Sequence, residues 1–369
     1  MARDPILQEL RHRLPASVRV YNTLSPIDMP FRDLAGHRHL FELLAGAAAR
    51  GTLPPSLLFA GPDGVGKRAA AIALAQLLNC PERLEVPAAS GTMIDACGTC
   101  PACRRIARGV HADVMELKPG DSGSIKTDET REAIKAARFR PFEGRRRVII
   151  IDQADALVGN AQDALLKTLE EPPPAAVFVL VTSLPDTLLP TVRSRCQRVR
   201  FGRLSPAEIA RVLERTQGYA PAEARAAASA ADGSLARALA EGSAEFAEAR
   251  DAALALLEGA AGTADPAARL GLARELASTG GGRGAGEREA LARRLRALSS
   301  LLRDLEVLSA RADGRWLANG DLADGLQRLL RSFEGDRALR AFSAVDRALG
   351  ALDRNASPKL VADWIAVTL

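Results

Sequence analysis

Residues 61–67 read Gly-Pro-Asp-Gly-Val-Gly-Lys and fit the pattern Gly-x-x-x-x-Gly-Lys of a phosphate-binding loop. Glycines let backbone N–H groups curve around a phosphate, the helix that follows adds positive potential, and the lysine reaches the terminal phosphates. The residues that would bind phosphate are Gly61, Gly64, Gly66 and Lys67. The next residue is Arg68, where the motif normally has a Ser or Thr hydroxyl that binds Mg²⁺. The loop therefore predicts a site with the shape of a nucleotide-binding site. It leaves open whether ATP binds there productively.

Two further polar residues end apolar runs later in the chain. Asp152 follows Val148–Ile151, where a second carboxylate that anchors Mg²⁺ belongs. Its neighbour is Gln153, whose amide cannot take a proton from an attacking water, so general-base catalysis should be largely lost. Thr182 ends the run Val177–Thr182, and its hydroxyl could sense a terminal phosphate. The alternative, in which Asp152 and Thr182 only cap local structure, stays open.

Four of the five cysteines form a group in the sequence. Cys80 is followed by Cys97, Cys100 and Cys103, and the last three make Cys-x-x-Cys-x-x-Cys. Four thiolates suit tetrahedral zinc, and a zinc ion with all four positions filled is structural because no position is open for chemistry. Such an ion would contribute on the order of 10 kcal/mol to local folding. The alternative is a loop of reduced thiols, and Cys196 stands apart from the group.

The elements that must position these residues alternate between strands and helices. Short apolar strands are expected at 56–60, 148–151 and 177–182, and helices at 67–78 and 160–170. Nearly continuous apolar strands separated by helices are typical of a parallel sheet covered on both faces, whose ligands bind at the carboxyl ends of the strands. We therefore expect an α/β nucleotide-binding-type domain at 29–203, with the metal module at 80–103.

After Leu204 the strand signals end and the remaining chain is expected to be helical. Ser205-Pro206-Ala207-Glu208 has the residues of a helix start, with a capping serine, a first-turn proline and an acidic first turn. A small helical domain is expected at 204–244, followed by an all-helical domain at 245–369. An apolar stripe near the end is expected to pack inside the chain, with packing between subunits as the alternative: Leu360, Val361, Trp364 and Ile365.

Composition excludes several classes of protein. The 369 residues are 47% hydrophobic and 26% charged, which suits a folded chain of several domains. We expect a cytoplasmic protein without membrane contact, because no run of about 18 apolar residues occurs and the first residues are charged where a signal peptide is apolar. Residues 1–28 are an N-terminal extension, and translation could instead begin at Met29. The net charge of +5 allows weak attraction to nucleic acid, whereas an aromatic content of 4% argues against a base-stacking surface.

The tripeptide Ser194-Arg195-Cys196 places an arginine at the edge of the predicted sheet domain. A guanidinium there could reach a neighbouring subunit and stabilise charge during phosphoryl transfer, an effect of about three to five orders of magnitude in GTPases. Judged by composition alone, Arg195 would be an ordinary surface charge, because other arginines are close in sequence: Arg193, Arg198, Arg200 and Arg203. The residues themselves leave both interpretations open.

Taken together, these motifs resemble the delta-prime subunits of bacterial DNA polymerase III clamp loaders, a branch of the AAA+ proteins. The most telling stretches are Asn160–Pro172 and Ser194-Arg195-Cys196. The cysteine tetrad agrees with this resemblance, as do Phe31–His37 and Gly233-Ser234-Leu235. The resemblance extends from about Phe31 to the C-terminus, and its motifs are specific over the first 240 residues.

The resemblance implies a nucleotide-binding-type domain with a zinc module, a helical lid and a helical collar that holds a hetero-pentamer with gamma/tau and delta subunits. In that ring the delta-prime subunit is a largely non-hydrolysing scaffold and a non-catalytic part of the DNA polymerase holoenzyme. Its Ser-Arg-Cys arginine, here Arg195, completes the ATP site of a neighbouring motor subunit. The complex loads a sliding clamp on primed DNA. Arg68 and Gln153 agree with this role, and the lid arginine of motor subunits would fall at Ala236.

Two other functions stay open. The chain could be an active ATPase motor of the gamma/tau type, although the expected Ser or Thr at 68 and Glu at 153 are absent. It could also be a free-standing zinc-containing protein of DNA binding or repair, which the positive net charge favours. The intact Gly66-Lys67 pair leaves residual nucleotide binding open as well.

Overall fold

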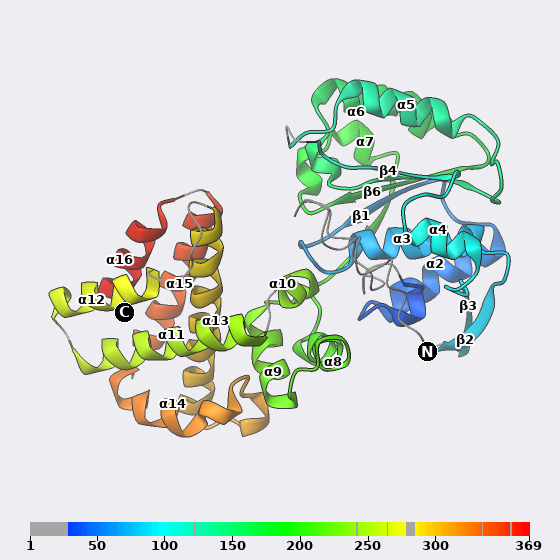
Figure 1. Cartoon of the computed structure of the whole chain (residues 1–369). Helices are drawn as coiled ribbons and strands as arrows, with labels where there is room; N and C mark the ends of the chain where they lie inside the picture. The colour runs from blue at the N-terminus through cyan, green and yellow to red at the C-terminus, as the bar shows by residue number, and fades with distance from the viewer. Residues whose placement is uncertain are drawn as a thin grey trace, which may run out of the picture.

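The computed structural model describes residues 29–89, 91–120, 123–240, 243–263, 265–277, 285–333, 335–354 and 356–369. The predicted extension at 1–28 lies outside the described residues. Figure 1 shows an α/β domain on one side, a group of C-terminal helices on the other, and further helices between them. Within the described ranges, no helix combines the length and the apolar character that crossing a membrane requires.

A five-stranded sheet forms the centre of the α/β domain. Its order is β4 (Val114–Leu117), β5 (Arg147–Ile151), β6 (Ala176–Thr182), β1 (Ser56–Ala60) and β7 (Gln197–Arg200). All four neighbouring pairs are parallel, and every residue of β1 and β6 is buried. The prediction of a parallel sheet with covered faces is therefore confirmed, and the three predicted strands differ from the observed ones by at most one residue at the start.

The other elements of this domain are one antiparallel hairpin and several helices. The hairpin consists of β2 (Leu84–Ala88) and β3 (Gly91–Asp95). The longer helices are α2 (Arg38–Arg50), α3 (Lys67–Asn79), α5 (Thr127–Ala137) and α6 (Gly159–Glu170). The shorter ones are η1 (Phe31–Asp33), α4 (Pro101–Ala107), η2 (Ala154–Ala156), η3 (Pro185–Thr187) and α7 (Pro190–Arg193).

Alternate residues of each strand face two separate hydrophobic cores. From β5, Val148 and Ile150 pack in the core that holds α2 and α3, whereas Ile149 and Ile151 pack in the core that holds α5 and α6. This alternation follows from the two-residue period of a strand, and it explains why the strands read as continuous apolar runs. Figure 1 shows α3 and α6 on opposite faces of the sheet. Polar side chains that do chemistry are thereby restricted to the strand ends.

Three short helices with their own core follow the sheet: α8 (Pro206–Gln217), α9 (Pro221–Ala230) and α10 (Leu235–Ala240). The predicted start of α8 is confirmed. The Ser205 hydroxyl accepts a hydrogen bond from the Glu208 N–H at 3.3 Å, and the Glu208 carboxylate accepts one from the Ser205 N–H at 2.8 Å. This reciprocal arrangement satisfies two backbone donors that a helix start leaves without helical partners.

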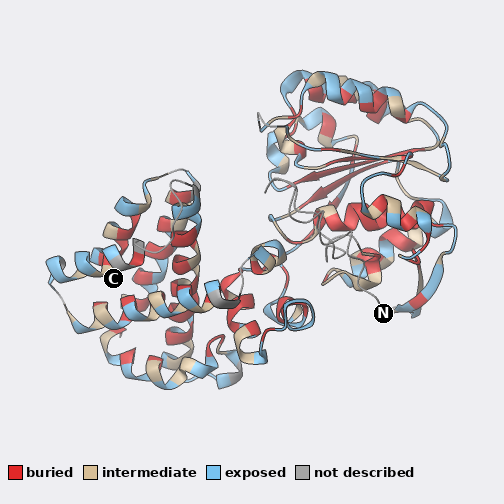
Figure 2. Ribbon diagram, viewed as in Figure 1, coloured by how far each residue is buried: buried red, intermediate tan, exposed pale blue. Residues whose placement is uncertain are grey.

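The C-terminal helices form the last group and pack around one long helix, α13 (Ala285–Ser309). The others are α11 (Ser243–Gly262), α12 (Pro266–Ala277), α14 (Ala323–Leu329), α15 (Arg337–Asp353) and α16 (Pro358–Thr368), with short turns η4 (Gly314–Trp316), η5 (Gly320–Leu322) and η6 (Leu330–Phe333). Figure 2 shows their buried residues facing one another and their exposed residues facing outward.

The expectation that the apolar stripe of α16 packs inside the chain is wrong for half of its residues. Val361 and Ile365 are buried in the core of the C-terminal helices. Leu360 is 69% exposed and Trp364 is 40% exposed. The reason is geometric, because adjacent positions of a helix point about 100° apart, so Leu360 and Trp364 point away from the core that Val361 and Ile365 enter.

Asp113 anchors the loop that leads into β5, and β5 in turn ends beside Asp152. The buried carboxylate of Asp113 accepts hydrogen bonds from the N–H groups of Phe142 at 2.7 Å and Gly144 at 2.7 Å, and it pairs with Arg147 at 3.0 Å. Burial alone would raise the pKa of Asp113, but the backbone N–H groups and Arg147 outweigh burial and lower that pKa below its ordinary value. The carboxylate is therefore charged and fixes the loop.

Asp113→Ala should lower the free energy of unfolding by about 3 kcal/mol, because it leaves backbone donors and the Arg147 guanidinium without their buried partner. Urea unfolding of the whole chain measures this difference. Asp128→Ala, which removes a carboxylate with 94% side-chain exposure on α5, is the matched control and should unfold like the wild type.

The stability of the wild type and the stability of Asp113→Ala should also respond differently to pH. The folded-state pKa of Asp113 lies below the ordinary value of 3.8, so its stabilising effect is complete above that value. It disappears as the pH falls through the folded-state pKa. The stability gap between wild type and Asp113→Ala should therefore shrink in acid, and a gap that stays constant would contradict the role of the charged form.

Candidate functional site

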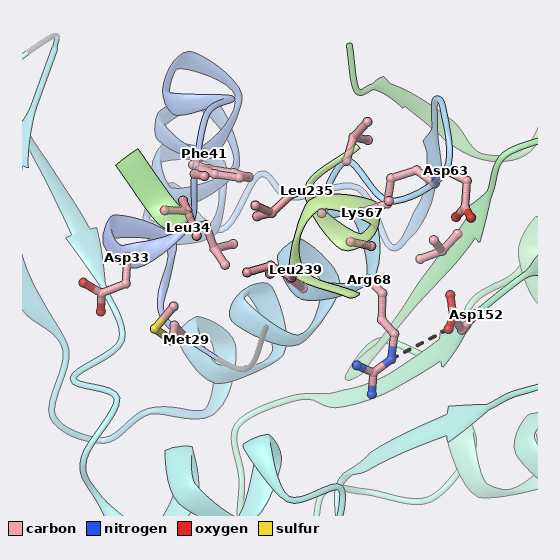
Figure 3. Close-up of a pocket in the computed structure, with 18 of the residues that line it drawn as sticks. Met29, Asp33, Leu34, Phe41, Asp63, Lys67, Arg68, Asp152, Leu235 and Leu239 are labelled. Carbon is pink, nitrogen blue, oxygen red and sulfur yellow. Dashed lines mark ion pairs between the residues drawn. The ribbon is translucent and has the colours of Figure 1, made fainter. Parts of the chain in front are cut away.

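A cavity of about 220 Å³ lies where the N-terminus of α3 meets the carboxyl ends of β1 and β5 (Figure 3). One side of its lining is polar and includes Asp63, Lys67, Arg68 and Asp152. The other side is apolar and includes Met29, Leu34, Phe41, Leu235 and Leu239. An apolar wall opposite a few converging charged groups is the usual composition of a small-molecule site. This cavity therefore has the character that a nucleoside with a charged phosphate tail requires.

The backbone conformation and the close packing of the loop explain why glycine occurs at the three predicted positions. Gly64 and Gly66 have φ values of 75° and 98°, which residues with a side chain rarely adopt, so the loop can turn tightly into α3. A Cβ atom on Gly61 would lie 2.2 Å from the Phe201 carbonyl oxygen, and one on Gly64 would lie 2.0 Å from the Ser234 hydroxyl. The loop thus packs directly against neighbouring backbone and side chains, and its N–H groups gather at a helix N-terminus.

Lys67 is buried at the start of α3 and stays within this loop. Its Nζ donates hydrogen bonds to the carbonyl oxygens of Gly61 at 2.9 Å and Pro62 at 2.6 Å. Burial lowers the pKa of the ammonium group, while the nearby carboxylates Asp63 and Asp152 act in the opposite direction. The lysine therefore provides a positive charge at the mouth of the loop.

Arg68 lies between two carboxylates at the ends of neighbouring strands. Its Nε donates to Glu116 Oε1 at 2.5 Å, and its terminal nitrogen donates to Glu116 Oε2 at 3.0 Å. Nε also lies 3.7 Å from Asp152 Oδ2, the ion pair marked in Figure 3. The sequence predicts Asp152 in this place. It does not predict Glu116, because the partner of Glu116, Arg68, lies 48 residues away in the sequence.

These contacts set opposite pKa shifts on the two carboxylates. Burial and the negative charge of Glu116 raise the pKa of Asp152, and Arg68 offsets only part of that effect. Burial also raises the pKa of Glu116, but the hydrogen bonds and charge of Arg68 outweigh burial and lower it overall. The Arg68 guanidinium is thus bound mainly by Glu116 through two hydrogen bonds, and it forms a longer ion pair with Asp152.

The residues around Asp152 do not fit the usual magnesium site. Mg²⁺ requires about six oxygen ligands at about 2.1 Å in nearly octahedral geometry. Position 68 offers a guanidinium in place of a hydroxyl, and Asp152 already pairs with that guanidinium. Residue 153 is Gln, with an amide where a general base would be needed. The phosphate loop is therefore present, whereas the residues that a magnesium site requires are not.

The Thr182 hydroxyl has local partners on both sides. It donates a hydrogen bond to Asp155 at 2.6 Å and accepts one from the N–H of Leu184 at 3.0 Å, and Thr182 is 1% exposed. These contacts match the alternative of a local cap at the end of β6. Sensing of a phosphate by Thr182 stays a prediction.

The helix α10 contacts the phosphate loop through main-chain atoms. The Ala236 N–H donates a hydrogen bond to the Gly64 carbonyl at 3.0 Å. Arg237, one position later, donates to the Ala231 carbonyl at 3.2 Å. Ala236 thus stands beside the loop, where the resemblance places a motor subunit's arginine.

The four predicted cysteines lie together and are buried. Their sulfur atoms are within 4.8 Å of one another, with Cys80 to Cys97 at 3.6 Å and Cys80 to Cys100 at 4.0 Å. Tetrahedral zinc with Zn–S bonds of about 2.3 Å would place its sulfurs about 3.8 Å apart. Backbone N–H groups also point at the sulfurs, as from Cys100 to Cys97 at 3.2 Å. The cluster can hold a metal ion, and its identity as zinc stays a prediction.

The segment before α2 connects the cysteine cluster to the cavity. The N–H groups of Phe31 and Arg32 donate to the Asp95 carboxylate at 3.3 and 3.0 Å. The Arg32 guanidinium donates to the carbonyl oxygens of Ala96 and Cys97. Leu34, two residues later, lines the cavity. One short segment thus contacts the cysteine module on one side and the candidate ligand on the other.

Arg195 follows α7 on the surface of the domain. Its Nε donates to Glu170 at 2.9 Å, and a terminal nitrogen donates to the Thr191 carbonyl at 2.9 Å. About a third of the side chain is exposed. The described residues that line the cavity do not include Arg195. The structure therefore does not bring Arg195 together with the other predicted site residues of the same chain.

Residues 36–205 match the family model described as "DNA polymerase III, delta subunit". The chain is 34% identical over 215 residues to DNA polymerase III subunit tau of Salmonella typhimurium, covering 57% of this chain and 32% of that protein. It is 35% identical over 187 residues to DNA polymerase III subunit gamma/tau of Mycobacterium tuberculosis, covering 50% and 31%. The chain thus spans about a third of the length of these relatives.

Two solved structures are similar to this chain over most of its length. A DNA polymerase III gamma subunit-related protein of Thermotoga maritima is 18% identical, covers 88% of this chain and 97% of that one, and has a TM-score of 0.44. The RuvB Holliday junction branch migration motor of Thermotoga maritima is 15% identical, covers 93% and 86%, and has a TM-score of 0.41. Residues 36–205 are therefore the part of the chain that is similar to DNA polymerase III subunits.

Freshly purified protein should contain about one equivalent of zinc, because four buried sulfurs fill one tetrahedral site. Cys97→Ala and Cys103→Ala should each lose most of that metal, as measured by mass spectrometry of the elements. Cys196→Ala is the control, since Cys196 is buried in a different core, and it should keep its zinc. Absence of zinc from the wild type would favour the alternative of reduced thiols.

Arg32→Ala should loosen the segment that lines the cavity, because it removes the donors to Ala96 and Cys97. We expect faster hydrogen exchange of residues 30–35 and 95–98, and a loss of about 1–2 kcal/mol in local stability. The exposed Arg38→Ala is the matched control. Equal exchange rates in the two variants would show that Arg32 does not hold this segment.

Proposed function

We propose that this chain is a delta-prime-like subunit of a DNA polymerase III clamp loader. In this role it is a largely non-hydrolysing scaffold that supplies Arg195 to the ATP site of a neighbouring subunit. The observation that carries the proposal is the Arg68 guanidinium between Glu116 and Asp152, at the place where an ATPase holds Mg²⁺. A chain with this site can keep the fold of an ATPase without hydrolysing ATP.

Two independent requirements of ATP hydrolysis are missing from the chain's own cavity. Phosphoryl transfer relies on a metal ion that bridges the phosphate oxygens and neutralises developing charge. It also relies on a residue that orients or deprotonates the attacking water, and Gln153 cannot accept a proton. The loss of both supports a stationary subunit and weakens the alternative of an active motor.

Arg195 has the properties that a residue acting on a neighbour would need. It lies outside the cavity of its own chain and is partly exposed. Its bonds to Glu170 and the Thr191 carbonyl hold the guanidinium in one direction, and an exposed ion pair of this kind contributes little stability. The arginine can therefore exchange Glu170 for a phosphate without a large cost in folding.

The partners that follow from the proposal are gamma/tau and delta subunits in a hetero-pentamer, with the sliding clamp and primer-template DNA bound through the complex. The C-terminal helices would serve as the collar that holds the ring. The proposed place of action is the cytoplasm, where a replication complex meets the chromosome.

A gamma/tau-like motor subunit is the second candidate, and one observation favours it. Its sequence relatives are named tau and gamma/tau subunits, and the phosphate loop of this chain keeps Gly64, Gly66 and Lys67. Arg68 and Gln153 argue against this candidate. A free-standing DNA-binding or repair protein is a third, and it rests on net charge alone.

Arg195→Ala should leave assembly of the reconstituted clamp loader intact and depress its DNA-stimulated ATP turnover. One site of the complex would lose its transition-state cation, an effect of about 10³-fold or more at that site by comparison with GTPases. Arg198→Ala, an exposed arginine of β7, is the matched control. Steady-state hydrolysis by the assembled complex measures both variants.

Unchanged turnover by a correctly assembled Arg195→Ala complex would exclude the role in trans. Hydrolysis by the isolated chain separates the two leading candidates. No turnover above background supports the scaffold, whereas robust turnover that Lys67→Ala abolishes would put the motor first.

A further inference from the structure

We propose that the cavity binds a nucleoside di- or triphosphate without a divalent metal ion, with the guanidinium of Arg68 as the fixed cation in place of Mg²⁺. The inference rests on the same observation as the proposed function, the Arg68 guanidinium in the place of Mg²⁺, but it does not depend on Arg195 or on assembly. It predicts a ligand that is held but not hydrolysed.

The half of the site that holds a nucleotide is complete. Gly64 and Gly66 adopt the left-handed backbone that curves the loop, and Lys67 stands at the start of α3, a helix of 13 residues. A Cβ atom on Gly66 would meet nothing within 4 Å, so the loop is open on that side. The apolar wall opposite, which includes Leu34 and Leu239, suits the flat face of a base.

The part of the site that would hold a metal ion is occupied by charged side chains of the protein. Glu116 and Asp152 carry two negative charges, and Arg68 and Lys118 carry two positive charges. Lys118 Nζ lies 3.0 Å from Glu116 Oε2. The four groups therefore balance without an ion. A Mg²⁺ ion at Asp152 would have to displace Arg68 from that carboxylate and then remain beside a like charge.

Arg68 can do for a phosphate what the metal ion does in an ATPase ground state. A guanidinium is always protonated and forms paired hydrogen bonds with phosphate oxygens. Arg68 lines the cavity and follows Lys67 directly, so two fixed cations lie beside the N-terminus of α3. The carboxylates fix the direction of Arg68 before any ligand binds, which lowers the ordering cost of binding.

The arrangement also explains why binding and hydrolysis separate in this chain. Arg68 can donate hydrogen bonds to phosphate oxygens in the ground state, but it cannot bridge them with the short coordination distances of a metal ion. Ala236, which lies beside the loop, provides no further cation. The nucleotide would therefore act as a static ligand between the loop and α10.

The experiment is equilibrium binding of N-methylanthraniloyl-ADP to the purified full chain, measured by fluorescence anisotropy. One buffer contains Mg²⁺, and the other is freed of divalent ions with a chelating resin before the protein is added, so that thiolate-bound zinc is retained. The dissociation constant should agree within about twofold between the two buffers, since the protein supplies the cation itself. Lys67→Ala should weaken binding in both.

Arg68→Thr restores the hydroxyl that a magnesium site uses and frees Asp152. Its binding should become dependent on Mg²⁺, at least about tenfold tighter with the ion than without it. Arg38→Thr is the matched control, because Arg38 is exposed and is not among the residues that line the cavity, and it should bind as the wild type does.

A measurement on the wild type alone covers the case in which Arg68→Thr does not fold. Mn²⁺ replaces Mg²⁺, and its paramagnetic resonance signal reports the free ion. Adding the protein to Mn²⁺ and ADP should release ion from the nucleotide, so that the free signal rises. A fall of that signal, a wild-type affinity at least tenfold tighter with Mg²⁺, or no nucleotide binding in either buffer would each overturn the proposal. None of these results bears on Arg195 in the assembled complex.

Discussion

The ion pair of Arg68 with Glu116 and Asp152 links the strands of the sheet to the phosphate loop at the one edge where polar groups are available. Two hydrophobic cores cover the faces of the sheet, so charges collect at the carboxyl ends of β4 and β5. In that place the chain carries its own cation on the first turn of α3. The poor fit to Mg²⁺ follows from this ion pair, and the proposed separation of nucleotide binding from hydrolysis rests on it.

The cysteine module contributes to the same cavity from the opposite direction. It does not touch the phosphate side, but its loop fixes the segment that carries Leu34 through the contacts of Arg32 and Asp95. A buried module with four sulfurs is rigid when it holds an ion, because the ion replaces a large apolar core in a small unit. The apolar wall of the cavity therefore depends on chemistry that occurs outside the cavity.

Local patterns made much of the fold and part of the site predictable. The phosphate loop, the capping box at Ser205 and the continuous apolar strands depend on neighbours within a few residues, and the structure has them as expected. Glu116 and Asp95 could not be found in this way, because their partners lie 48 and 63 residues away in sequence. The exposure of Trp364 was missed for a related reason, since a helix pattern does not say how many neighbours pack against it.

The hydrogen bond between the Ala236 N–H and the Gly64 carbonyl has a mechanical meaning. It joins α10 to the phosphate loop through main-chain atoms, and this close approach requires glycine at position 64, because a Cβ atom there would meet Ser234 and Ala236. The phosphate loop and α10 are therefore joined without a charged side chain at Ala236, and a shift of either part would strain this hydrogen bond and be passed to the other.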